Sequence, residues 1–181
     1  MSNETMENKE KKRRLLIILL CIGIAVCIAV TVWALFFRNT DNTPLIPDFA
    51  PEQTEPNAQP VDGDGNKMDV PQGGGGISLE YVSSVTVSLS ENKAYFQYTH
   101  PAKSTQNIVL CIMVQDTMIA RSGLITPGHK ITELTLSDGI AKKLSAGTYK
   151  NAQFKILSYD PKSGEKAMVD TVAEITVTVN P

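Results

Sequence analysis

The sequence predicts an all-β domain, a seven-stranded β-sandwich, that follows one transmembrane helix and a disordered linker. Three observations lead to this prediction. The first is a run of 23 residues without a charge near the start of the 181-residue chain. The second is a long acidic stretch rich in Pro and Gly. The third is a series of short alternating segments, with no long helical pattern, over the last 105 residues.

Residues 15–37 form the predicted transmembrane helix. A helix of 23 residues is about 34 Å long, enough to cross the hydrocarbon core of a bilayer, which is roughly 30 Å thick. The basic tail, residues 1–14, carries five Lys and Arg within KEKKRR, whereas Arg38 is the one basic residue that closely follows the run. This asymmetry predicts a cytoplasmic N-terminus and a C-terminal domain outside the cell. The lipid bilayer is therefore the first expected partner.

A cleaved signal peptide is the alternative interpretation of the same basic and apolar segments. The apolar run is longer than the roughly 7–15 residues of a signal peptide, and Val32-Trp33-Ala34 is a poor cleavage site. We therefore expect an uncleaved signal anchor, which makes the chain a single-pass protein of the cell membrane.

Residues 38–76 are predicted to be a disordered acidic linker. From Asn39 they carry seven carboxylates against one lysine, Lys67, and too little apolar surface to offset the entropy of ordering. The stretch DGDGNKMD at 62–69 begins like a calcium-binding loop. However, Lys67 stands where such a loop needs its sixth-position glycine, and Gly73 stands where it needs a bidentate glutamate. The stretch therefore indicates a tether and not a metal site.

Residues 77–181 are expected to form the extracellular domain. Seven segments read as strands: 84–89, 94–99, 108–114, 118–125, 130–136, 148–159 and 166–179. Between the fifth and sixth, SDGIAKKLSAG breaks the alternation and predicts one or two helical turns, with Ser137 as the N-cap. Short strands at regular spacing without a long helix are typical of a β-sandwich.

The stretch Leu144-Ser145-Ala146-Gly147-Thr148-Tyr149 resembles the tyrosine corner of immunoglobulin-like and fibronectin type III-like domains. The resemblance implies a structural corner formed by Leu144, Gly147 and Tyr149, in which the tyrosine hydroxyl bonds back to the backbone. The chain departs from antibody domains because it lacks their cysteine pair. The order of basic tail, span, acidic tether and small sandwich is also similar to that of uncharacterised surface proteins of Gram-positive bacteria. That resemblance implies display outside the membrane and no known chemistry.

No group of residues predicts an enzyme, a metal site or a cofactor. His100 and His129 lie in predicted loops without a third metal ligand beside them. Cys111 lies in the apolar run IVLCIMV, which favours a buried, inert thiol. Ser90 and Lys93 match the S-x-x-K motif of penicillin-interacting serine enzymes, but they fall in a predicted hairpin turn and not at a helix start.

The segment 108–114 is apolar on both of its alternating faces. One face carries Ile108, Leu110, Ile112 and Val114, and the other carries Val109, Cys111 and Met113. A sandwich strand normally keeps one face in contact with water. Either loops or the helical IAKKL cover the second face, or the second face meets a partner. Val109, Cys111 and Met113 are therefore a candidate partner face.

These observations predict a non-enzymatic module that binds or assembles with an unknown protein of the envelope or cell surface. The alternative is an accessory structural subunit of a membrane complex, which contacts the complex through its transmembrane helix. An enzyme is the third and least favoured reading. Nucleic acid is not expected as a partner, because ten Lys and Arg balance nine Asp and Glu in the outer domain.

Overall fold

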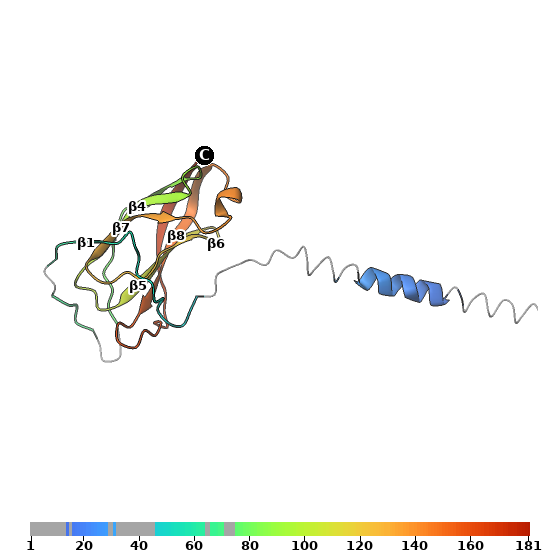
Figure 1. The fold of residues 1–181 in the computed structure, drawn as a ribbon, viewed down its shortest axis with the longest axis horizontal. Coiled ribbons are helices and arrows are strands. Elements are labelled where there is room, and N and C mark those ends of the chain that lie inside the picture. The colour runs from blue at the N-terminus through green and yellow to red at the C-terminus, as the bar shows by residue number, and fades with distance from the viewer. Residues whose placement is uncertain (1–13, 15, 29–30, 32–45, 64–65, 71–74) are drawn as a thin grey trace, which may run out of the picture. The chain divides into compact units, whose positions relative to one another are not determined.

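The computed structural model describes residues 14, 16–28, 31, 46–63, 66–70 and 75–181 (Figure 1). The chain divides into two units, Met1–Asn42 and Thr43–Pro181. In the first unit, residues 16–28 form a helix whose large apolar side chains are all more than half exposed.

The predicted transmembrane helix covers more residues than this helix does. Within the part of the chain that the structure describes, no helix is both long enough and apolar enough to cross a membrane. Residues 15, 29–30 and 32–37 of the predicted span lie outside the described residues.

The described residues of the second unit are nearly all β-strand and loop. The strands are β1 (Gln59–Pro60), β2 (Glu80–Tyr81), β3 (Ser84–Ser88), β4 (Lys93–His100), β5 (Asn107–Val114), β6 (Thr117–Arg121), β7 (His129–Thr135), β8 (Gly147–Tyr159) and β9 (Thr171–Asn180). The all-β class is confirmed. β3 to β9 correspond in order to the seven predicted strands, and β1 and β2 are two short additions.

The described strands form one sheet in the order β1-β7-β4-β3-β9-β8-β5-β6, and β2 pairs with β4 beside this path. Neighbouring strands are antiparallel except β3 and β9, which run parallel and join the two halves of the sheet. The far ends also meet, because Ala120 of β6 forms a bridge with Leu136 just after β7. The sheet therefore curls until the half β7-β4-β3 faces the half β9-β8-β5-β6.

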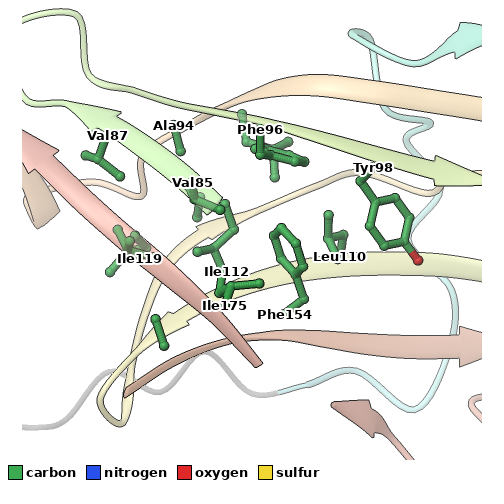
Figure 2. Close-up of a cluster of buried hydrophobic side chains, with 14 of the residues drawn as sticks. Val85, Val87, Ala94, Phe96, Tyr98, Leu110, Ile112, Ile119, Phe154 and Ile175 are labelled. Atoms are coloured by element: carbon green, nitrogen blue, oxygen red, sulfur yellow. The ribbon is translucent and has the colours of Figure 1, made fainter. Parts of the chain in front are cut away.

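The main core lies between these two halves (Figure 2). Phe154 of β8 is fully buried, and its ring centroid lies 5.5 Å from that of Phe96 and 5.9 Å from that of Tyr98, both on β4. Buried residues alternate with more exposed ones along β3 and β4, as expected for strands with one face in a core.

The segment between β7 and β8 contains a single turn of 3₁₀-helix, η1 (Ile140–Lys142). The N-cap position is occupied by Gly139, whose φ of 75° favours glycine, and it makes no side-chain cap bond. The predicted cap, Ser137, contributes its carbonyl instead, which accepts a hydrogen bond of 3.1 Å from the Ile140 amide.

The prediction of a disordered linker over residues 38–76 is corrected only for the described residues of this range, 46–63, 66–70 and 75–76. Residues 46–55, which we call the strap, run along the domain: Phe49 forms a bridge with Glu165, and Thr54 forms one with Leu124. β1 then pairs with the edge of β7. Backbone hydrogen bonds hold these segments on the domain. Because such bonds do not require apolar side chains, the composition of the sequence did not indicate that these segments are ordered. Residues 38–45, 64–65 and 71–74 lie outside the described residues.

The stretch that begins like a calcium loop also lies against the domain. The Lys67 ammonium donates hydrogen bonds to the carbonyls of Ala102 at 2.8 Å and Ser104 at 2.9 Å. Lys67, which does not fit the calcium-binding motif, thus connects this stretch by hydrogen bonds to the loop between β4 and β5.

Candidate functional site

The candidate partner face on β5 is covered by the chain itself. Val109, Cys111 and Met113 are buried in a second apolar cluster, which also contains Met118, Leu157 and Tyr159. Ile46 and Ala50 of the strap pack against this cluster, together with Leu124. The sequence was right that both faces of the strand are apolar. Of the two alternatives, cover by a loop segment is the one that the structure shows, because the strap occupies the second face, and the possible partner face of Val109, Cys111 and Met113 is not free.

Polar contacts along its length hold the strap in place. The Tyr159 hydroxyl donates a hydrogen bond to the Pro47 carbonyl at 3.3 Å, and the Ala50 amide donates one to the Gly164 carbonyl at 2.8 Å. Further along, the buried Glu55 carboxylate accepts hydrogen bonds from the amides of Gly123 at 2.8 Å and Asn57 at 3.1 Å. The strap is therefore a fixed part of the domain surface.

Cys111 lies beneath the strap and is not poised for chemistry. Burial is the main cause that raises the pKa of its thiol to about 11. Because the thiolate is the reactive form, a thiol with this pKa is inert near neutral pH.

The predicted structural corner has the hydrogen bond that the resemblance implies. The Tyr149 hydroxyl donates to the Ser145 carbonyl, four residues upstream, at 2.9 Å. Leu144 packs against the main core, and Gly147, with a φ of 149°, begins β8. The corner is a structural element and offers no reactive group.

The remaining candidates for chemistry are engaged in local structure. His100 is fully buried, and its Nε2 lies 2.8 Å from the Gln106 carbonyl. His129 Nδ1 lies 3.0 Å from Thr126 Oγ1 in its own turn. Lys93 pairs with the Glu133 carboxylate 2.7 Å away, and the Ser90 hydroxyl donates a hydrogen bond to the Pro181 carbonyl at 3.2 Å. Among the residues that the structure describes, no three His, Cys, Asp or Glu side chains form a metal site.

A shallow groove crosses the outer face of β3, β4 and β7, and we call it the outer groove. Its volume is about 350 Å³, and it is lined by Val82, Ser84, Tyr95, Phe96, Gln97 and Thr132. Two irregularities of the sheet coincide with it. The β-structure is interrupted at Val82, between the end of β2 and the start of β3. The pairing of β4 with β7 also shifts register between Tyr95 and Tyr98. Bulges of this kind often adjoin binding sites because they redirect side chains.

The outer groove combines exposed apolar surface with a polar rim. Val82 is 45% exposed. The neighbouring Tyr81 packs its ring edge-on against the buried Phe154, with centroids 5.8 Å apart, and so lies on the core side of the sheet and not in the groove. At the rim, the Tyr95 hydroxyl donates a 2.7 Å hydrogen bond to the Glu91 carboxylate, which raises the pKa of Tyr95. This composition suits a protein surface as ligand.

The outer groove was not among the sites predicted from the sequence. It depends on a register shift and a strand break, which have no residue signature of their own. The one available signal was the apolar Val82, which lies just before the first predicted strand.

Comparison with known proteins does not identify the chain. No protein-family model matches it, and no curated protein matches it in sequence. Among solved structures, the chain is similar to AggA, the major subunit of aggregative adherence fimbriae type I from Escherichia coli. The identity is 12% and the TM-score 0.27, over 59% of this chain and 96% of that one. A likeness with so low a TM-score carries no argument about function.

Proposed function

We propose that this chain is a single-span membrane protein that displays an immunoglobulin-like β-sandwich outside the cell and binds another envelope or surface protein through it. The observation that carries the binding role is the outer groove, where the exposed Val82 and the hydrogen-bonded Tyr95 lie beside polar groups.

The membrane anchor is supported by the first unit and its sequence. The helix over residues 16–28 exposes apolar side chains on all sides, a pattern that in proteins belongs to an apolar environment. It lies within the 23-residue uncharged run, directly after the basic tail. Both features favour insertion in a bilayer with the N-terminus inside.

The immunoglobulin-like assignment is supported by the strand pairing. If β3 to β9 are taken as strands A, B, C, C′, E, F and G, one half of the sheet has the order E-B-A and the other has G-F-C-C′. These are the neighbours found in the two sheets of immunoglobulin-like sandwiches. The hydroxyl contact of Tyr149 then falls at the corner between strands E and F, where such domains place it.

Binding is favoured over catalysis because the reactive residue types have structural roles. His100 and Cys111 are buried, and Lys93 is paired with Glu133. By contrast, the outer groove exposes Val82 beside Tyr95, whose ring is held in place by the hydrogen bond to Glu91. Aromatic residues with rigid support are the side chains that contribute most at protein interfaces.

The test is recovery of the partner with the full-length chain, cross-linked in intact cells and purified from membranes. Thr132→Arg places a long cation in the outer groove and should abolish recovery. Thr117→Arg is the matched control, because this threonine is also exposed but lies on β6. It should recover the partner as the unaltered chain does. Equal recovery with both variants would exclude the outer groove as the binding site.

A third variant separates this proposal from the accessory-subunit alternative. Residues 15–37 are replaced by an unrelated apolar segment of the same length. A binding module keeps its partner, because the outer domain makes the contact. If the partner is lost while the altered chain still reaches the membrane, the helix makes the contact and the alternative holds.

A further inference from the structure

Three apolar side chains gather at one end of the domain, and we call them the apolar tip: Phe49, Met168 and Val169. Their exposed fractions are 60%, 101% and 78%. Phe49 belongs to the strap, whereas the other two belong to the loop between β8 and β9. Phe49 and Met168 line a common hollow of about 440 Å³, so the tip is one surface made from two distant segments.

The apolar tip is built on a rigid support. The Lys166 amide donates a 2.8 Å hydrogen bond to the Asp48 carbonyl, and the Ala167 amide donates one of 2.8 Å to the Ser158 carbonyl. The Asp170 carboxylate forms ion pairs with Lys155, at 3.2 Å, and with Lys166. None of the three tip residues belongs to either buried cluster. Their exposure therefore serves no packing purpose within the domain.

The place where the strap begins limits how far this end of the domain can be from the bilayer. Nine peptide units join Ile46, the first described residue of the strap, to Phe37, the last residue of the predicted span. A fully extended chain of that length covers roughly 32 Å at most. Part of this distance lies within the lipid headgroup layer. Phe49 follows Ile46 by three residues, so the apolar tip belongs to the end that is held near the membrane.

We propose that the apolar tip docks into the outer surface of the same bilayer that holds the anchor. This inference rests on the single-span anchor of the proposed function. Aromatic and aliphatic side chains are favoured at the boundary between headgroups and acyl chains. The covalent link makes docking intramolecular, and the resulting high effective concentration allows a small apolar surface to suffice.

The charges beside the tip indicate that apolar insertion, and not attraction to anionic lipid, drives the docking. In the loop between β8 and β9, two lysines, Lys162 and Lys166, stand against three carboxylates, Asp160, Glu165 and Asp170. A surface without excess positive charge gains little from a negative bilayer. Docking should therefore occur on bilayers of zwitterionic phosphatidylcholine.

Docking at the tip would set the orientation of the whole domain. β9 runs from Thr171, beside the tip, to Asn180 at the opposite end, where the C-terminus lies (Figure 1). With the tip at the bilayer, the C-terminal end points away from the membrane. The position of the outer groove relative to the surface is then fixed and not left to free rotation.

The experiment uses the full-length chain in nanodiscs that hold one copy each, made of phosphatidylcholine with brominated acyl chains, which quench nearby tryptophan fluorescence. Trp33 is the sole tryptophan of the chain and lies in the predicted span. The unaltered chain therefore tests the anchor. The tip is tested by Trp33→Phe combined with Met168→Trp, and the matched control is Trp33→Phe combined with Asn180→Trp, an exposed position at the other end of β9.

We expect strong quenching of native Trp33 and several-fold more quenching of the Met168→Trp reporter than of the Asn180→Trp reporter. Adding Phe49→Ser and Val169→Ser to the Met168→Trp chain should reduce its quenching to the control level. Circular dichroism confirms that each chain keeps its β-structure.

Three outcomes oppose the inference, and they are distinguishable. If Trp33 is quenched and the two reporters are equally unquenched, the anchor stands but the tip does not dock. If both reporters are equally quenched, the domain lies on the bilayer without using the tip. If Trp33 itself is unquenched, the anchor fails, and the inference fails with it. A tip that meets a second copy of the chain would also leave the Met168→Trp reporter unquenched in single-copy discs.

Discussion

The two buried clusters of the domain are built in different ways. Among the described residues, the main core contains 22 buried hydrophobic residues, and all seven long strands contribute to it, so each half of the sheet closes the other. The second cluster contains six, on the outer side of β5, β6 and β8, and the strap completes it. The strands of the sheet form the main core by themselves. The second cluster is covered only when the strap, which precedes the strands in the chain, packs against it. We therefore expect the two clusters to respond differently to substitution.

The largest effect should come from the main core. Phe154→Ala removes a fully buried ring that contacts both halves of the sheet, and such changes lower the free energy of unfolding by about 3–5 kcal/mol. Denaturant unfolding of residues 43–181, followed by circular dichroism, measures it. Met168→Ala, at a fully exposed position, is the control and should change the midpoint little. A small effect of Phe154→Ala would mean that the halves do not pack as described.

A smaller effect, restricted to the strap, is expected from Gly123→Ala. A Cβ atom at this position would lie 2.8 Å from the backbone nitrogen of Glu55 and from the carbonyl carbon of Thr54, so the strap must move. Overpacking of this kind costs about 1–3 kcal/mol. Because the strap covers Cys111, the main readout is the rate at which a thiol reagent modifies that residue, which should rise strongly.

Gly139→Ala provides the comparison for that experiment. Its Cβ would meet no atom within 4 Å, but its φ of 75° makes alanine strained. This variant should lose some stability without a selective rise in the modification of Cys111. If both variants expose Cys111 in proportion to their loss of stability, the strap does not open as a separate unit.

The same contrast explains which parts of the structure could be predicted. The strands around the main core follow from alternation, because each has one apolar face. The strap could not be found in this way: Ile46 and Ala50 are its packed apolar residues, and most of its contacts are backbone hydrogen bonds. Composition averages cannot detect those, and prolines such as Pro47 and Pro51 of the strap argue against regular structure but not against order.

The candidate sites show the same limit. The apolar second face of β5 was a correct observation, but sequence alone could not distinguish an external partner from the chain's own strap. Lys67 was correctly judged unsuitable for calcium, yet nothing in its neighbours indicated the carbonyls of Ala102 and Ser104 as its partners. Tyr149 was found because a corner depends on local sequence. The outer groove was not, because it depends on how β4 shifts against β7.

Two tyrosines on β8 allow a finer test. Tyr149 donates to Ser145 within its own corner, and Tyr159 donates across the second cluster to Pro47 of the strap. Replacing either with Phe removes one hydrogen bond and should cost about 0.5–1.5 kcal/mol. We expect Tyr159→Phe, and not Tyr149→Phe, to speed the modification of Cys111. Equal rates would show that the hydroxyl of Tyr159 does not hold the strap.

The substitution with the smallest expected effect at neutral pH concerns His100. It also distinguishes the strap from residues 66–70, which belong to the same predicted linker. Burial lowers the pKa of this side chain, and the nearby charges of Lys67 and His129 act in the same direction, whereas the carbonyls of Gln106 and Ser78 oppose them. The unfolded chain therefore binds the proton more tightly than the folded one. The contribution of His100 to the free energy of unfolding should be constant above about pH 6.5 and should fall as the pH drops from there towards the folded-state pKa.

His100→Gln keeps a donor for the Gln106 carbonyl but does not titrate. The loss of stability in acid that is due to His100 should therefore disappear in this variant, and urea melts between pH 7.5 and 5 measure it. Since His100 lies beside the residues that bind Lys67 and not under the strap, acid should loosen residues 66–70 in hydrogen exchange before it exposes Cys111. Simultaneous loosening of both segments would mean that the strap and the Lys67 contact form one cooperative unit.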